Sequence, residues 1–143
     1  MAAGSAPLRE VARHHAELIE MMRRLERVVA LPIGHPNVRR AVIDAVSSVR
    51  SAFAEHRKAT EGSAGLYAGL VDSAPRLSRA IDELIDDHAS ISAAADTLQE
   101  HAHAEPAWLH ERAGELLRDL ARHRQRGADL VYEAYATDLG GET

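Results

Sequence analysis

The stretch Ile81–Ile91, with the sequence IDELIDDHASI, indicates the fold more clearly than any other part of the chain. Its apolar residues recur at intervals of three, four and seven, which is the period of an amphipathic helix and not the alternation of a strand. His88 falls on this apolar stripe, three residues from both Ile85 and Ile91. The pattern therefore predicts a helix that turns a histidine toward the core. The acids between these positions are interpreted as a solvated face, including the pairs Asp82–Glu83 and Asp86–Asp87.

Prolines mark the boundaries of four helices with the same periodicity. Proline is favoured in the first turn of a helix, because its missing N–H is not needed there. Four prolines each precede a long stretch with an apolar stripe, whereas alternation typical of strands is absent. We therefore expect helices over Pro7–Leu31, Pro36–Glu61, Pro75–Ala102 and Pro106–Thr137.

The lengths of the connections predict how these helices pack. The links Leu31–His35 and His103–Glu105 are short, so each joins two antiparallel helices. The fold class is therefore all-α, an up-down-up-down antiparallel four-helix bundle. The glycine-containing stretch Thr60–Ala74 is expected to be a frayed helix end followed by a loop. We expect a single domain over residues 1–143, with disorder at 1–6 and 140–143.

Composition excludes several classes of function. The 143 residues suit one domain, and the lack of cysteine excludes disulfides, cysteine-based zinc sites and thiol nucleophiles. Seventeen Lys and Arg against 22 Asp and Glu give a net charge of −5, which argues against a nucleic-acid partner. No apolar run is long enough for a membrane span, and no targeting segment is visible. We expect a cytoplasmic protein.

Each predicted helix places a histidine on its apolar stripe. These are His15, His56, His88 and His123, whose heights along the bundle agree to within roughly 8 Å at about 1.5 Å per residue. Imidazoles without partners in an aliphatic core would cost several kcal/mol, and a metal ion satisfies several at once. The alternative is separate core histidines, each bonded to a carbonyl or to water. His14 also lies near the first stripe, so the choice between it and His15 stays open.

These histidines carry a resemblance to a known family. The segments His15-Ala-Glu-Leu18 and His88-Ala-Ser-Ile91, with His56 and His123, lie at spacings of 41, 32 and 35 residues. In this placement the chain resembles hemerythrin-like (HHE cation-binding) domains over nearly its whole length. The resemblance implies two non-heme irons held by histidines from all four helices and by two bridging carboxylates. It also implies handling of dioxygen, peroxide or nitric oxide, as a carrier or sensor, as a peroxidase- or catalase-like enzyme, or as an oxidase. Zinc and manganese are alternative metals.

The sequence departs from the family pattern at the carboxylates. The family pattern His-x-x-x-Glu on the second and fourth helices is replaced here by Thr60 and Gly127 at the acidic position. Glu61 is the expected ligand from the second helix, because the glycine that follows allows the helix to unwind there. Asp129 is the candidate from the fourth helix, although a regular helix does not bring it beside the histidine. Asp119 is the alternative.

Two tyrosines are candidates for contact with a bound oxygen species. Tyr132 is the first choice and Tyr67 the second, in a polar pocket roofed by residues 60–74. The alternative is that they are packing or surface residues. The missing acids also support a competing function, in which a metal-free helical module binds a partner or a small molecule near Tyr67.

Overall fold

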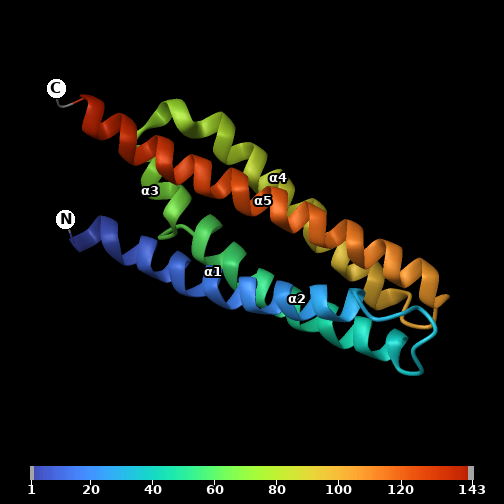
Figure 1. Cartoon of the computed structure of the whole chain (residues 1–143). Helices are drawn as coiled ribbons and strands as arrows, with labels where there is room; N and C mark the ends of the chain where they lie inside the picture. The colour runs from blue at the N-terminus through green and yellow to red at the C-terminus, as the bar shows by residue number, and fades with distance from the viewer. Residues whose placement is uncertain (1, 142–143) are drawn as a thin grey trace.

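Helices are the only regular secondary structure in the part of the chain that the structure describes. The computed structural model describes residues 2–141, and among these it contains no strand. Figure 1 shows α1 (Ala2–Val29), α2 (Val38–Glu61), α3 (Leu66–Ser73), α4 (Ser78–Glu100) and α5 (Pro106–Gly141), with a 3₁₀ turn over Pro75–Leu77 before α4. The predicted all-α class is confirmed.

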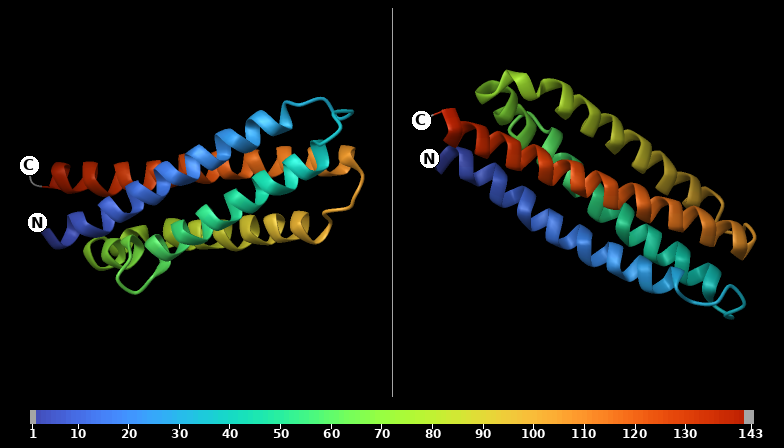
Figure 2. Two further views of the ribbon diagram at one scale, coloured as in Figure 1. Left: turned by 90° about the horizontal axis from the view of Figure 1, so that it is seen from below. Right: turned by 45° about the horizontal axis from the view of Figure 1, so that its top comes forward.

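The four long helices form an antiparallel bundle. Short connections join α1 to α2 and α4 to α5 at one end, while both chain ends lie at the other (Figures 1 and 2). This is the predicted up-down-up-down order. Within the described range, no helix has the length and apolar composition needed to cross a membrane.

The helix boundaries differ from the predicted ones mainly near the chain ends. Helix α1 begins at Ala2, five residues before the expected start, and α5 continues to Gly141. The first and last helices of the bundle are therefore longer than the sequence predicts. The sequence predicted disorder at 1–6 and 140–143, but residues 2–6 and 140–141 are helical, and Met1 and residues 142–143 lie outside the described residues.

The link between α2 and α4 is not the expected loop. It contains the helix α3, whose residues Leu66, Tyr67 and Leu70 are buried. A Cβ at Gly65 would lie 2.8 Å from the Ala59 carbonyl oxygen, so only glycine lets the start of α3 pass this close to the end of α2. The prediction of a loop was wrong: the segment folds back as a helix whose apolar side chains are buried against the rest of the bundle.

The apolar core is divided into two clusters along the bundle. The cluster nearer the short connections includes Phe53, Ile91 and Leu120, and the cluster nearer the chain ends includes Leu84 and Leu130. The buried histidines of α2, α4 and α5 belong to neither cluster and lie at the level between them. A polar layer therefore interrupts a core that is otherwise built mainly from aliphatic side chains.

Candidate metal centre

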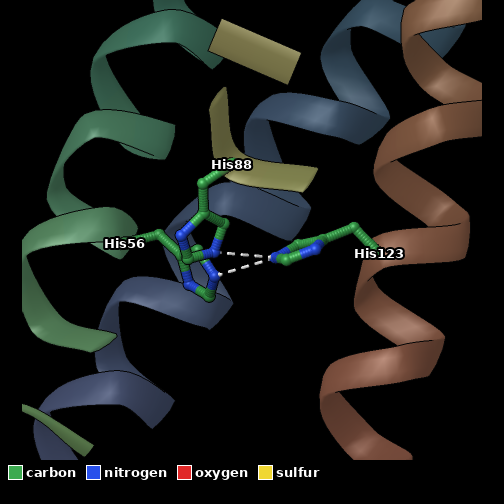
Figure 3. Close-up of side chains that lie close together, drawn as sticks. All are labelled: His56, His88 and His123. Carbon is green, nitrogen blue, oxygen red and sulfur yellow. Dashed lines mark hydrogen bonds between the residues drawn. The ribbon is translucent and has the colours of Figure 1, made fainter. Parts of the chain in front are cut away.

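Three buried histidines from three helices meet in this layer. His56 on α2, His88 on α4 and His123 on α5 are 7%, 0% and 4% exposed. Their rings converge through Nε2 (Figure 3): Nε2 of His123 lies 3.0 Å from Nε2 of His88 and 3.4 Å from Nε2 of His56. The structure thus brings together three of the four stripe histidines.

Two carboxylates hold the other nitrogen of two of these rings. Nδ1 of His88 contacts Oε2 of Glu61, and Nδ1 of His123 lies 3.2 Å from Oδ2 of Asp87. An ionised carboxylate only accepts hydrogen bonds, so each Nδ1 carries the proton and donates it. Each Nε2 therefore presents a lone pair, and two lone pairs face each other. This arrangement is repulsive unless a cation lies among these atoms.

The positions of the Nε2 atoms fit one shared cation. Two nitrogens bound at about 2.1 Å to one ion, at angles of 90–110°, lie roughly 3.0–3.4 Å apart. The separations observed around His123 are 3.0 and 3.4 Å. In addition, Nδ1 of His56 is buried without a hydrogen-bond partner among the described residues, so the ring has no polar interaction outside the cluster to account for its burial. The donor set therefore fits a metal ion held by three imidazoles.

Burial keeps these imidazoles in the form that binds metals. Burial, followed by repulsion from His88 and His123, lowers the pKa of His56 to about 3. Burial likewise lowers the pKa of His88 to about 4, although the hydrogen bond with Glu61 opposes this shift. The pKa of His123 is also lowered by burial, against the effect of Asp87. All three rings are neutral near pH 7, as coordination requires.

Two aromatic side chains, Phe53 on α2 and Tyr67 on α3, pack against the imidazole rings. Phe53, the single phenylalanine, packs against all three imidazoles at centroid distances of 5.4 to 5.9 Å. Tyr67 on α3 stacks nearly parallel on His88, with centroids 5.9 Å apart and an interplanar angle of 15°. Burial raises the pKa of Tyr67 well above its usual value, and its hydroxyl group interacts with Thr60. Tyr67 is therefore a neutral packing partner of His88.

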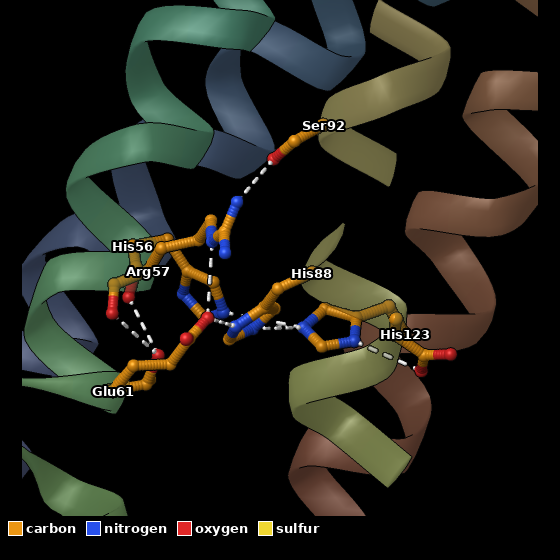
Figure 4. Close-up of polar contacts among 8 residues, drawn as sticks. His56, Arg57, Glu61, His88, Ser92 and His123 are labelled. Carbon is orange, nitrogen blue, oxygen red and sulfur yellow. Dashed lines mark hydrogen bonds and ion pairs between the residues drawn. The ribbon is translucent and has the colours of Figure 1, made fainter. Parts of the chain in front are cut away.

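Glu61 contacts Nδ1 of His88, whereas Nε2 of His88 faces the other two histidines. Helix α2 remains regular up to Glu61, whose carboxylate turns toward α4 and does not lie among the three Nε2 atoms. Arg57 holds it with a contact of 3.1 Å from Nε to Oε2, and Arg57 also donates to Ser92 at 3.1 Å (Figure 4). In this structure Glu61 orients His88 and is not placed as a ligand.

Asp87 is a site residue that the sequence analysis assigned to a solvated face. Its carboxylate accepts hydrogen bonds from His123 and from Arg126, the latter at 3.0 and 3.1 Å. Two sequence signals pointed to it: it directly precedes His88, and Arg126 lies three residues after His123. Neither signal was sufficient, because the pairing joins α4 to α5 and depends on how the two helices face each other.

The two histidines of α1 point to different surroundings. His15 is half-buried and lines a cavity together with His56 and His123, but it is not part of the three-histidine group. His14 is buried beside Glu10, with 3.2 Å from Nε2 to the carboxylate. Of the two, His15 is the one directed toward the cluster.

The remaining predicted residues lie away from the cluster. Asp129 is exposed and accepts a hydrogen bond from Gln125, and Asp119 pairs with Arg122 at 2.7 Å. Tyr132 is 75% exposed and contributes to the wall of the cavity. Among the described residues, no carboxylate joins the group formed by the three Nε2 atoms.

The comparisons with known proteins agree with this geometry. The family model for the "Hemerythrin HHE cation binding domain" matches residues 6–139, which is nearly the whole chain. The chain matches no curated protein and no solved structure.

Proposed function

Because the chain belongs to the hemerythrin HHE cation-binding family, we propose that His56, His88 and His123 hold a non-heme iron ion and that the protein handles dioxygen, peroxide or nitric oxide there. One observation carries the proposal. The Nε2 lone pairs of His88 and His123 face each other at 3.0 Å, and a bound cation removes their repulsion. The family match and the neutral state of the imidazoles support the same conclusion.

The protein contributes orientation, neutral ligands and largely apolar surroundings. Glu61 and Asp87 hold the Nδ1 protons of His88 and His123, which keeps both Nε2 atoms directed at one point. Phe53 and the aliphatic clusters on either side surround the layer with apolar side chains. A bound iron ion would supply redox chemistry toward a small oxygen or nitrogen species.

A cavity gives small molecules access to this centre. It lies between α1 and α5, and its wall contains His15, His56 and His123. His15 is the candidate for an additional ligand, because it faces the same cavity. Tyr132 lies in the outer wall, so its proposed role is contact with molecules that enter the cavity and not coordination of the first ion.

The donor set supports one iron more strongly than two. The family resemblance implies two irons and bridging carboxylates, whereas the two nearest carboxylates here are hydrogen-bonded to Nδ1 atoms. A second ion would need Glu61 or Asp87 to leave its histidine. We therefore propose one tightly held iron per chain.

Metal analysis tests the proposal directly. Protein produced with iron available should contain about one iron per chain, and His88→Ala should lose it. His103→Ala is the matched control, because His103 is exposed on the connection between α4 and α5. Folded protein that stays metal-free after anaerobic reconstitution with ferrous iron would contradict the proposal and favour a metal-free binding module. Zinc as the bound metal would contradict the redox function alone.

A further inference from the structure

The cavity beside the histidine cluster is larger than a passage for dioxygen needs to be. Its volume is about 390 Å³, within the range of sites that bind small organic molecules. Most of its wall is apolar, with Leu18, Ile19 and Met22 from α1 facing Leu120 and Val131 from α5. The wall therefore suits a ligand with an apolar body.

A glycine inside α5 keeps part of this space open. Gly127 lies in the cavity wall, one turn after His123. Its φ is not positive, and an added Cβ would meet no described atom within 4 Å. Neither backbone conformation nor close packing requires glycine here, although glycine within a helix costs about 1 kcal/mol relative to alanine. The observable consequence of Gly127 is open space beside the cluster.

The charge in the described wall of the cavity is positive. Of the lining residues with described side chains, only Arg124 is charged, and no carboxylate is present. The neighbouring Arg122 and Arg126 are paired with Asp119 and Asp87. Arg124 forms no ion pair or hydrogen bond in the part of the chain that the structure describes. An unpaired cation beside an apolar cavity is complementary to an amphipathic anion.

We propose that the cavity binds a small organic anion with an apolar body, such as a medium-chain carboxylate. Its anionic end pairs with Arg124, and its apolar body occupies the space between α1 and α5 that Gly127 leaves open. Since His56 and His123 also line this cavity, the bound molecule lies against the candidate metal centre. The binding site is complete without a metal ion and does not depend on the proposed function.

Binding is measured by calorimetry and two-dimensional NMR on the full chain, both after treatment with a chelator and after loading with iron. The probes are octanoate, octylamine and 1-octanol, which share one tail and differ in the charge of the head group. We expect octanoate to bind at least about tenfold more tightly than octylamine, as a charge-assisted hydrogen bond contributes. NMR shifts should be confined to residues that line the cavity.

Three variants test separately how the head group and the tail of the probe contribute to binding. Arg124→Gln should reduce octanoate affinity to that of 1-octanol, and Arg124→Glu should reverse the preference in favour of octylamine. Gly127→Leu should weaken all three probes at least about tenfold while raising helix stability, because it fills the cavity at a helical position. Arg118→Gln is the matched control, since Arg118 is exposed on α5 and lies outside the cavity wall.

Different results of these measurements would contradict different parts of the proposal. Equal affinity for octanoate and octylamine, or unchanged binding in both Arg124 variants, would overturn the role of the charge. Unchanged binding in a folded Gly127→Leu protein would overturn the location. If the protein binds octanoate but no iron, only the proposed metal function fails. If it binds iron but none of the probes, only this inference fails.

Discussion

Nε2 of His88 lies 3.0 Å from Nε2 of His123, while a carboxylate faces Nδ1 of each of these rings. The two histidines therefore direct lone pairs at each other in a layer between two apolar clusters. The same carboxylates make the imidazoles better ligands, because partial negative charge at Nδ1 raises the basicity of Nε2. The arrangement is set up in the folded chain, so metal binding does not require the side chains to be rearranged.

The first prediction concerns the two carboxylates that contact Nδ1 of His88 and His123. Glu61→Gln and Asp87→Asn should each lower iron affinity about 10- to 100-fold, since both remove the charge that orients and polarises a ligand. Affinity is measured by competition with a chelator of known strength. Asp119→Asn is the matched control, because Asp119 also pairs with an arginine on α5 but lies away from the cluster. Equal affinity in all three variants would remove the orienting role.

A second prediction concerns the stability added by the metal. An ion that binds only the folded state at a thousand times its dissociation constant stabilises that state by about 4 kcal/mol. For a chain of this length, about 2–4 °C is expected per kcal/mol, so iron should raise the melting temperature by roughly 10 °C. Calorimetry with and without a chelator measures the shift. His88→Ala should abolish it, and His103→Ala should preserve it.

The third prediction concerns the metal-free protein at acid pH. Burial lowers the folded-state pKa of His56 to about 3 and that of His88 to about 4, below the value of 6.5 expected in the unfolded chain. Between these values the unfolded state binds more protons, so stability is full above pH 6.5 and falls as the pH falls. The loss is up to about 1.4 kcal/mol per group and pH unit in this window. Urea unfolding at pH 7.5 and pH 5.0 checks it, and His88→Leu should make the difference smaller.

A fourth prediction concerns the close approach of α3 to α2. Gly65→Ala should destabilise the fold by about 1–3 kcal/mol, because the new Cβ would meet the carbonyl oxygens of Ala59 and Thr60. Gly69→Ala is the control within α3, where a Cβ meets no described atom within 4 Å. This control should be neutral or stabilise by up to about 1 kcal/mol. Equal melting temperatures for the two variants would contradict the packing described for α3.

The fifth prediction separates packing from coordination at the tyrosines. Tyr67→Phe should keep the visible spectrum and the iron content, because the ring can still stack on His88 without its hydroxyl group. Tyr67→Ala should weaken iron retention, since it removes that support. Tyr132→Phe should leave the spectrum unchanged, as Tyr132 is 75% exposed. Loss of an intense visible band in either phenylalanine variant would instead show that a tyrosinate coordinates the metal.

Features with a local cause could be predicted from the sequence. The spacing of apolar residues around His88 predicts an amphipathic helix, because the apolar stripe can be recognised within the sequence of a single helix. The short connections then predict that neighbouring helices are antiparallel. The same periodicity places His56, His88 and His123 on core-facing stripes at similar heights. Their convergence in one layer follows from these positions.

Features that depend on contacts between helices could not be predicted in this way. The direction of Glu61 toward His88 and the pairing of Asp87 with His123 depend on how α2, α4 and α5 are rotated about their axes. The helical form of residues 66–73 depends on the space that Gly65 leaves beside α2. The sequence by itself therefore determined the four long helices and the burial of His56, His88 and His123. Only the tertiary structure decided which carboxylates orient those histidines and which side chains line the cavity, because side-chain packing between helices sets their rotation.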